Sequence, residues 1–220
     1  MDVSRKQALQ LGLGAFLLLL VSPFLPLLEV VAFAIGAWSL LLFWRDARAQ
    51  AAARWPSVAL ALLVASFLAL FLGGPFAAQA FARGDIGLWT KLVWLYAVAN
   101  VALAGAFYAA PHGLAGERAK LLLGLALGIA VAVAASTTYR EVDAGQRYGA
   151  ALHDIEAAHP GTNDTDNATR AAQLQQAQDA FQSDAESLLA AQGIPYVVFA
   201  WAYATMLGVV TRAQRAEQNA

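Results

Sequence analysis

Six apolar runs divide this chain, and charged residues, glycines or prolines separate each run from the next. The runs cover residues 7–22, 27–44, 56–73, 88–110, 120–138 and 194–211. A helix needs about 20 predominantly apolar residues to cross the hydrocarbon core of a bilayer. The pattern therefore predicts an all-α, polytopic integral membrane protein with six transmembrane helices.

Glycine and proline set the expected ends of these runs. Pro23 and Pro26 bracket a short turn between the first two runs, and the Gly-Gly-Pro sequence at 73–75 is expected to end the third. Proline lacks a backbone donor and disfavours helix in the residue before it. An alternative merges residues 7–44 into one kinked helix and leaves five spans. A signal peptide is disfavoured for the first run, because no convincing small-residue cleavage site follows it.

The composition agrees with a membrane protein rather than with a large soluble domain. The 220 residues are 60% hydrophobic and 13% charged, whereas a soluble domain carries about 25% charged residues. The chain contains no cysteine, so it has no disulfides, thiolate metal ligands or cysteine nucleophiles.

The basic residues predict the orientation, because cytoplasmic loops carry an excess of lysine and arginine. With a cytoplasmic N-terminus, nine of the fourteen basic residues lie inside beside four acids, and eleven acids lie outside. The nine are Arg5, Lys6, Arg45, Arg48, Arg54, Arg118, Lys120, Arg212 and Arg215. Both the reverse orientation and the five-span alternative conflict with the rule. We therefore expect a multi-pass protein of the cell membrane with cytoplasmic N- and C-termini.

Residues 139–193 form a long polar segment, which is predicted to be an external helical hairpin between the fifth and sixth spans. We expect helices over 139–158 and 168–191, with Asp166 or Asn167 as the N-cap of the second. The segment is acidic, so it is a solvated surface, a region that recruits cations or a docking site for a basic partner. A hairpin of this size buries little area alone, so it should pack on outer loops, on a second copy or on a partner. Its apolar stripes are Tyr148, Leu152 and Ile155 on the first helix, and Leu174, Ala177, Phe181, Ala185 and Leu188 on the second.

Two shorter external features allow more than one interpretation. Asn163 and Asn167 each begin an Asn-X-Thr sequon, which predicts possible glycosylation if the host modifies exported protein. Such short sequons also arise by chance. Residues 76–82 are short and amphipathic, and they either lie along the outer membrane interface or form an ordinary loop.

One face of the fifth span is made of small residues. Gly124, Gly128, Ala132 and Ser136 are each four residues apart, which places them on one side of a helix. Helix faces made of small side chains let the backbones of two helices approach closely in lipid. We therefore expect a helix-packing interface here, either within the chain or between subunits.

Few polar side chains fall within the spans, and intramembrane polar groups are functional candidates. The candidate polar lining consists of Glu29, Lys91, Tyr96, Asn100 and Tyr108. Asn100 is near the middle of the fourth span, and Tyr96 and Tyr108 are expected on its face. The alternatives are interfacial snorkelling for Glu29 and Lys91, and a bond to a neighbouring helix for Asn100.

The sequence shows no recognisable catalytic arrangement. None of the spans carries a histidine, so haem ligation within the bilayer is not expected. His153 and His159 are six residues apart and fall on different helical faces, which argues against a shared metal site. Carboxylate pairs, Ser–His pairs and phosphate-binding glycine loops are absent, as is a basic, aromatic-rich surface for nucleic acid. We therefore expect no enzyme activity, no cofactor, no metal and no nucleic-acid partner.

These features favour a non-catalytic integral membrane subunit or scaffold. It would present the acidic hairpin to an extracytoplasmic protein and assemble as a homo-oligomer or within a membrane protein complex. The alternative is an oligomeric channel or transporter for an ion or small solute, with the polar residues as its lining.

Overall fold

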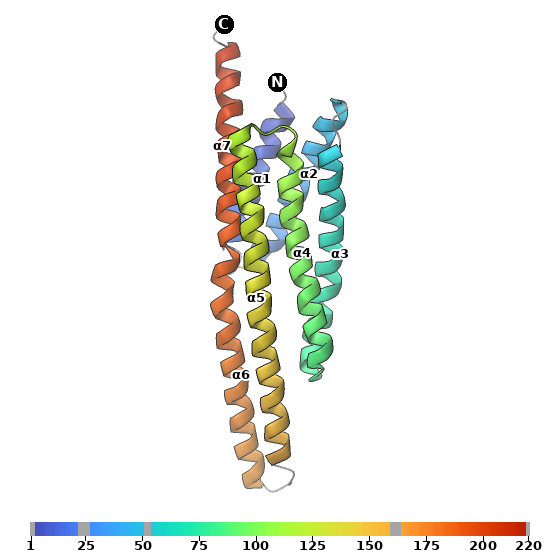
Figure 1. The fold of residues 1–220 in the computed structure, drawn as a ribbon, viewed down its shortest axis with the longest axis vertical. Coiled ribbons are helices and arrows are strands. Elements are labelled where there is room, and N and C mark those ends of the chain that lie inside the picture. The colour runs from blue at the N-terminus through green and yellow to red at the C-terminus, as the bar shows by residue number, and fades with distance from the viewer. Residues whose placement is uncertain (1–2, 22–26, 51–53, 159–163, 219–220) are drawn as a thin grey trace.

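The computed structural model describes residues 3–21, 27–50, 54–158 and 164–218, which fold as long helices joined by short turns (Figure 1). The helices are α1 (Val3–Val21), α2 (Leu27–Ala49), α3 (Arg54–Ala82), α4 (Ile86–His112), α5 (Glu117–Ala158), α6 (Asp164–Gln192) and α7 (Ile194–Gln218). No strand occurs among the described residues. The predicted all-α fold class is therefore confirmed.

Five of the described helices, α2, α3, α4, α5 and α7, are long and apolar enough to cross a membrane. Each carries one of the predicted apolar runs. The first run lies in α1, which also contains Arg5 and Lys6. The architecture is therefore that of a multi-pass, membrane-embedded helical bundle.

Aromatic side chains from four helices form the centre of the bundle. The ring of Phe16 on α1 lies 4.7 Å from Phe107 on α4, and 5.4 and 5.1 Å from Phe199 and Tyr203 on α7. Phe43 on α2 lies 6.3 Å from Tyr203. All five side chains are buried, so this cluster fixes how α1, α2, α4 and α7 pack together.

Glycine and serine let α1 and α2 approach this cluster closely. A Cβ on Gly12 would overlap the ring of Tyr203, and a Cβ on Gly36 would lie 2.8 Å from Cζ of Phe107. The hydroxyl of Ser39 donates a buried hydrogen bond of 2.6 Å to the carbonyl of Ala8. The α1–α2 pair therefore packs tightly against α4 and α7.

The two ends of the bundle differ. The start of α1, the end of α7 and the α4–α5 connection share one end, whereas the α3–α4 turn and the α5–α6 pair extend from the other (Figure 1). The 42 residues of α5 correspond to a helix about 63 Å long. Its second half and α6 therefore project well beyond the other helices as an antiparallel hairpin.

The expected end of the third run at 73–75 is wrong, because α3 continues through Pro75 to Ala82. Proline removes one helical hydrogen bond, and neighbouring helices can offset that loss. Here Ala77, Ala80 and Phe81 pack in a cluster with residues of α4, α5 and α6. Residues 76–82 are therefore the last two turns of α3 and not a separate interfacial piece or loop.

The predicted start of the second hairpin helix is also wrong. Helix α6 begins at Asp164, so Asp166 and Asn167 lie inside its first turns and neither is its N-cap. Acidic residues in a first turn interact favourably with the positive end of the helix dipole, which favours helix over loop there. The first hairpin helix agrees with expectation, since α5 runs unbroken to Ala158.

Candidate functional site

The projecting hairpin is held together by ion pairs and ring contacts between α5 and α6. Arg147 on α5 lies 3.2 Å from Asp184 on α6, and Arg170 on α6 lies 3.7 Å from Glu156 on α5. Exposed ion pairs contribute only about 0–1 kcal/mol each. They set the register of the two helices more than they stabilise the pair.

Four aromatic side chains pack together where the α5–α6 hairpin contacts the α3–α4 hairpin. Phe81 on α3 lies 5.6 Å from Trp89 on α4, 5.1 Å from Tyr148 on α5 and 4.8 Å from Phe181 on α6. Trp89 and Phe181 are 6.0 Å apart and meet edge to face. Aromatic pairs contribute about 0.5–1.5 kcal/mol each beyond the area they bury. We call these four residues the aromatic brace.

Two glycines let α5 come close enough for the brace to form. A Cβ on Gly145 would overlap the indole of Trp89, and a Cβ on Gly149 would lie 2.8 Å from Cγ1 of Ile86. The two glycines are four residues apart, so they share one face of α5. Any larger residue at Gly145 would push α5 away from α4.

The α3–α4 turn fixes the position of Trp89. Gly84 has a φ of +71°, a conformation that costs glycine little. The carboxylate of Asp85 accepts a hydrogen bond of 2.9 Å from the backbone N–H of Leu88 and caps α4. Trp89 follows in the first turn of α4, and its side chain is only 5% exposed.

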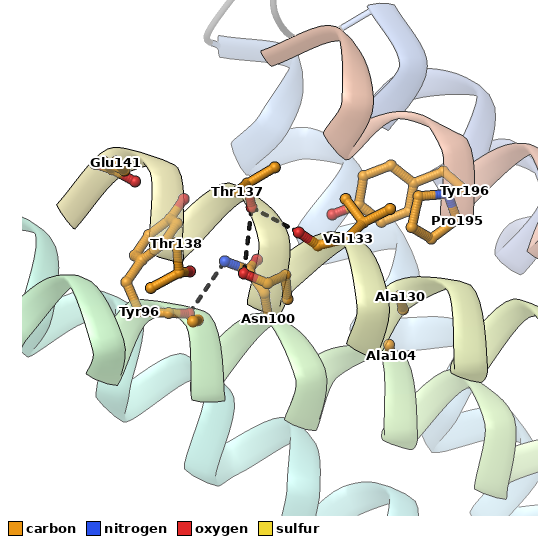
Figure 2. A pocket seen from close by; sticks show the side chains of 12 residues that line it. Tyr96, Asn100, Ala104, Ala130, Val133, Thr137, Thr138, Glu141, Pro195 and Tyr196 are labelled. Carbon is orange, nitrogen blue, oxygen red and sulfur yellow. Dashed lines mark hydrogen bonds between the residues drawn. The ribbon is translucent and has the colours of Figure 1, made fainter. Parts of the chain in front are cut away.

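A small cavity of about 60 Å³ with a partly polar lining lies between α4, α5 and α7 (Figure 2). The amide of Asn100 donates to the carbonyl of Tyr96 at 3.1 Å, and the hydroxyl of Thr137 donates to the carbonyl of Val133 at 2.8 Å. A water molecule needs at least about 10–15 Å³ of such volume, so the cavity has room for a few waters. Its polar lining residues are Tyr96, Asn100, Thr137, Thr138, Glu141 and Tyr196.

The structure brings together two of the five predicted lining residues. Tyr96 and Asn100 line the cavity. Tyr108 does not, because eight residues displace it about 12 Å along the helix, and its ring lies 4.9 Å from that of His112. Lys91 is exposed and also lies outside the cavity lining. The side chain of Glu29 is outside the described residues.

The other polar lining residues were not predicted from sequence. Thr137 and Glu141 are four residues apart on α5, and Tyr196 is in the first turn of α7. The spacing of Thr137 and Glu141 is a weak signal of a shared polar face. Their meeting with Asn100 depends on which helices become neighbours, and a single sequence does not contain that information.

The small-residue face of α5 points away from the bundle. Gly124, Gly128, Ala132 and Ser136 are all exposed. A Cβ added at Gly124 or Gly128 would meet no atom of the described residues within 4 Å. Packing of this face within the chain is therefore not seen among those residues, and an interface between subunits stays a prediction.

One of the two sequons can be placed. Asn167 is exposed near the start of α6, whereas Asn163 lies outside the described residues. Glycosylation of either residue stays a prediction.

Within the described parts of the chain, no three His, Asp or Glu side chains are grouped so that they could hold a metal ion. No protein-family model, curated protein or solved structure matches this chain.

Proposed function

We propose that the chain is a non-catalytic subunit or scaffold of the cell membrane that presents the α5–α6 hairpin to an extracytoplasmic protein partner. The observation that carries this proposal is the aromatic brace. A lone two-helix hairpin is marginally stable, but this one contacts α3 and α4 through Phe81 and Trp89. A surface held in one orientation loses less conformational entropy when a partner binds.

The proposal includes six spans with both termini cytoplasmic. The apolar part of α1, residues 7–21, is about 22 Å long, which is shorter than the hydrocarbon thickness of about 30 Å. A span of this length would be steep or would use its flanking residues as anchors. The start of α1, the end of α7 and the α4–α5 connection lie together (Figure 1). The basic residues of these segments therefore share one end, which supports a cytoplasmic assignment for that end.

Ion pairs within the hairpin reduce the negative charge that is available to attract a basic partner. Arg147 lies 3.2 Å from both Asp143 and Asp184, and Glu156 faces Arg170. Part of the negative charge is therefore balanced within the hairpin. We infer that the partner recognises the shape and polar groups of the hairpin as well as its remaining acids.

The test is native mass spectrometry of the protein extracted gently from its own membrane. The informative variant replaces residues 153–175 with a short glycine-rich turn, which removes the hairpin tip and leaves Tyr148 and Phe181 in place. We expect a stoichiometric partner on the wild-type chain and its loss from the variant. The matched control replaces Arg147 with Gln, which removes the ion pairs with Asp143 and Asp184 and leaves the tip intact.

Two results would contradict the proposal. One is a partner that stays bound to the variant without the tip, because the hairpin would then not be the docking surface. The other is a wild-type protein without any partner that transports a specific solute in pure liposomes.

The second candidate function is an oligomeric channel or transporter. The Asn100 cavity favours it, because amide, hydroxyl and carboxylate groups of three helices meet there. The outward small-residue face of α5 would allow a homo-oligomer. A cavity of about 60 Å³ would have to widen before a solute larger than water could pass.

A further inference from the structure

A groove of about 740 Å³ is lined by Arg5 near the start of α1, by the start of α5 and by residues 204–213 of α7. The starts of α1 and α5 lie at the end of the bundle opposite the hairpin (Figure 1). One wall is apolar and includes Met206, Val209 and Val210 of α7. The lining also includes three basic residues, Arg5, Arg118 and Arg212, which we call the basic wall. The groove therefore combines an apolar strip with three positive charges from three helices.

The three arginines are held in different ways. Arg5 donates a hydrogen bond to the carbonyl of Leu114, which also lines the groove, while its Nε is buried without a partner among the described residues. Arg212 folds back along α7, with one guanidinium nitrogen 3.9 Å from the position of a Cβ on Gly208. Arg118 is exposed in the first turn of α5. All three residues line the groove.

Among the described residues, Glu117 is the one acid that lines the groove, and it does not cancel this charge. The carboxylate of Glu117 lies 2.8 Å from the ammonium of Lys120 and is offset by it. Burial lowers the pKa of the Arg5 guanidinium, and the nearby carboxylate of Asp46 opposes that shift. Arginine stays protonated in proteins, so the described lining of the groove keeps a net positive charge.

The first turn of α5 adds a weaker contribution of the same sign. Leu114, Ala115 and Gly116 lead into the helix along the groove, and the unpaired N–H groups of a helix start favour anions. This effect alone would not define a site. It adds to the arginines at the same place.

We propose that this groove binds an anionic phospholipid, with its phosphate between the arginines and an acyl chain along the apolar wall of α7. A soluble anion would use only the basic wall, and a neutral lipid only the apolar wall. Basic pockets between transmembrane helices are suited to anionic lipid headgroups. This inference does not depend on the scaffold function.

The test is native mass spectrometry of the purified full chain with phosphatidylglycerol or phosphatidylcholine of the same chain length. We expect phosphatidylglycerol to be retained at least tenfold more strongly. A basic residue near a membrane contributes about fivefold to anionic lipid binding. Arg118→Gln and Arg212→Gln should therefore each lower phosphatidylglycerol retention by about this factor.

The matched control is Arg215→Gln, which removes the same charge from α7 at a residue that does not line the groove. It should retain the lipid like the wild type. Val209→Trp keeps every charge but fills the apolar wall at an exposed position, so it should also lower lipid retention. Melting temperatures of all variants establish that each one folds.

Three results would overturn the proposal. Equal retention of the two lipids would remove the role of charge. Equal losses for Arg215→Gln and Arg212→Gln would show diffuse attraction rather than a site. Displacement of the lipid by millimolar inorganic phosphate, with Val209→Trp unaffected, would identify a soluble anion as the ligand.

Discussion

The hydroxyl of Tyr203 on α7 donates a buried hydrogen bond of 3.0 Å to the carbonyl oxygen of Phe107 on α4. Phe107 is four residues before Pro111, which lies inside the same helix. Proline has no N–H to donate to that carbonyl. Tyr203 therefore supplies from another helix the donor that α4 cannot supply itself.

Tyr203→Phe should lower the free energy of unfolding by about 1–3 kcal/mol, because it leaves a buried carbonyl without a donor. The ring contacts with Phe16 and Phe43 would remain. Tyr108→Phe is the control, since its ring contact with His112 does not need the hydroxyl. The measurement is thermal or denaturant unfolding in detergent micelles.

A double-mutant cycle isolates the cause of that loss. Pro111→Ala restores an N–H that can donate to Phe107, so Tyr203→Phe should cost less in this background. An equal cost with and without Pro111 would show that the hydroxyl acts in some other way.

Gly145→Ala should weaken the brace, because its Cβ would overlap the indole of Trp89. Overpacking of this kind costs about 1–3 kcal/mol. Gly128→Ala is a matched control on the same helix, where a Cβ meets nothing among the described residues within 4 Å. It should stabilise α5 by up to about 1 kcal/mol through helix propensity, so the two substitutions should have opposite signs.

Hydrogen exchange gives the local readout for the brace. We expect faster exchange of amides in residues 142–158 and 167–184 in Gly145→Ala, and unchanged exchange in Gly128→Ala. In a Trp89→Ala background, which lacks the indole, Gly145→Ala should no longer lower the free energy of unfolding. A penalty that persists without the indole would mean that the contact does not position the hairpin.

Gly124→Leu and Gly128→Leu test the outward face of α5. Both positions are open in the single chain, so monomer stability should change little. Self-association should weaken, because bulky side chains keep helix backbones apart in lipid. Energy transfer between labelled chains in liposomes measures this, and an unchanged oligomer distribution would remove the face from any interface.

Asn100→Leu separates the two candidate functions. The amide bonds within its own helix to Tyr96, so we expect stability to change by less than about 1 kcal/mol. The scaffold proposal predicts that partner binding is unchanged and that wild-type liposomes show no specific solute flux. Specific flux that Asn100→Leu abolishes would instead favour the channel.

The sequence predicted the helices well, because apolar runs near membrane length leave few alternatives. The two apolar stripes, one with Tyr148 and the other with Phe181, also indicated a pair of helices, and these two rings are 5.6 Å apart. The brace itself was missed. Phe81 belongs to a segment after Pro75 for which the local pattern predicts an interfacial piece or a loop, whereas in the structure it is helical and packs on α4, α5 and α6.

The Asn100 cavity could also be predicted only in part from the sequence. Asn100 was a candidate because amides are rare within spans, yet its neighbours Thr138 and Tyr196 come from helices far along the chain. Tyr108 was grouped with Asn100 by helical position, whereas distance along the axis separates them. Periodicity defines faces within a helix but does not say which helices meet.

The claim that matters most is that the hairpin stands on the opposite side of the membrane from both termini. The chain has no cysteine, so single cysteines at Asp154, Ala49 and Ala216, all at exposed positions, can be labelled with a membrane-impermeant maleimide. We predict labelling of Asp154→Cys in intact cells, and of Ala49→Cys and Ala216→Cys only after permeabilisation. Labelling of Ala216→Cys in intact cells, or protection of Asp154→Cys, would contradict the account.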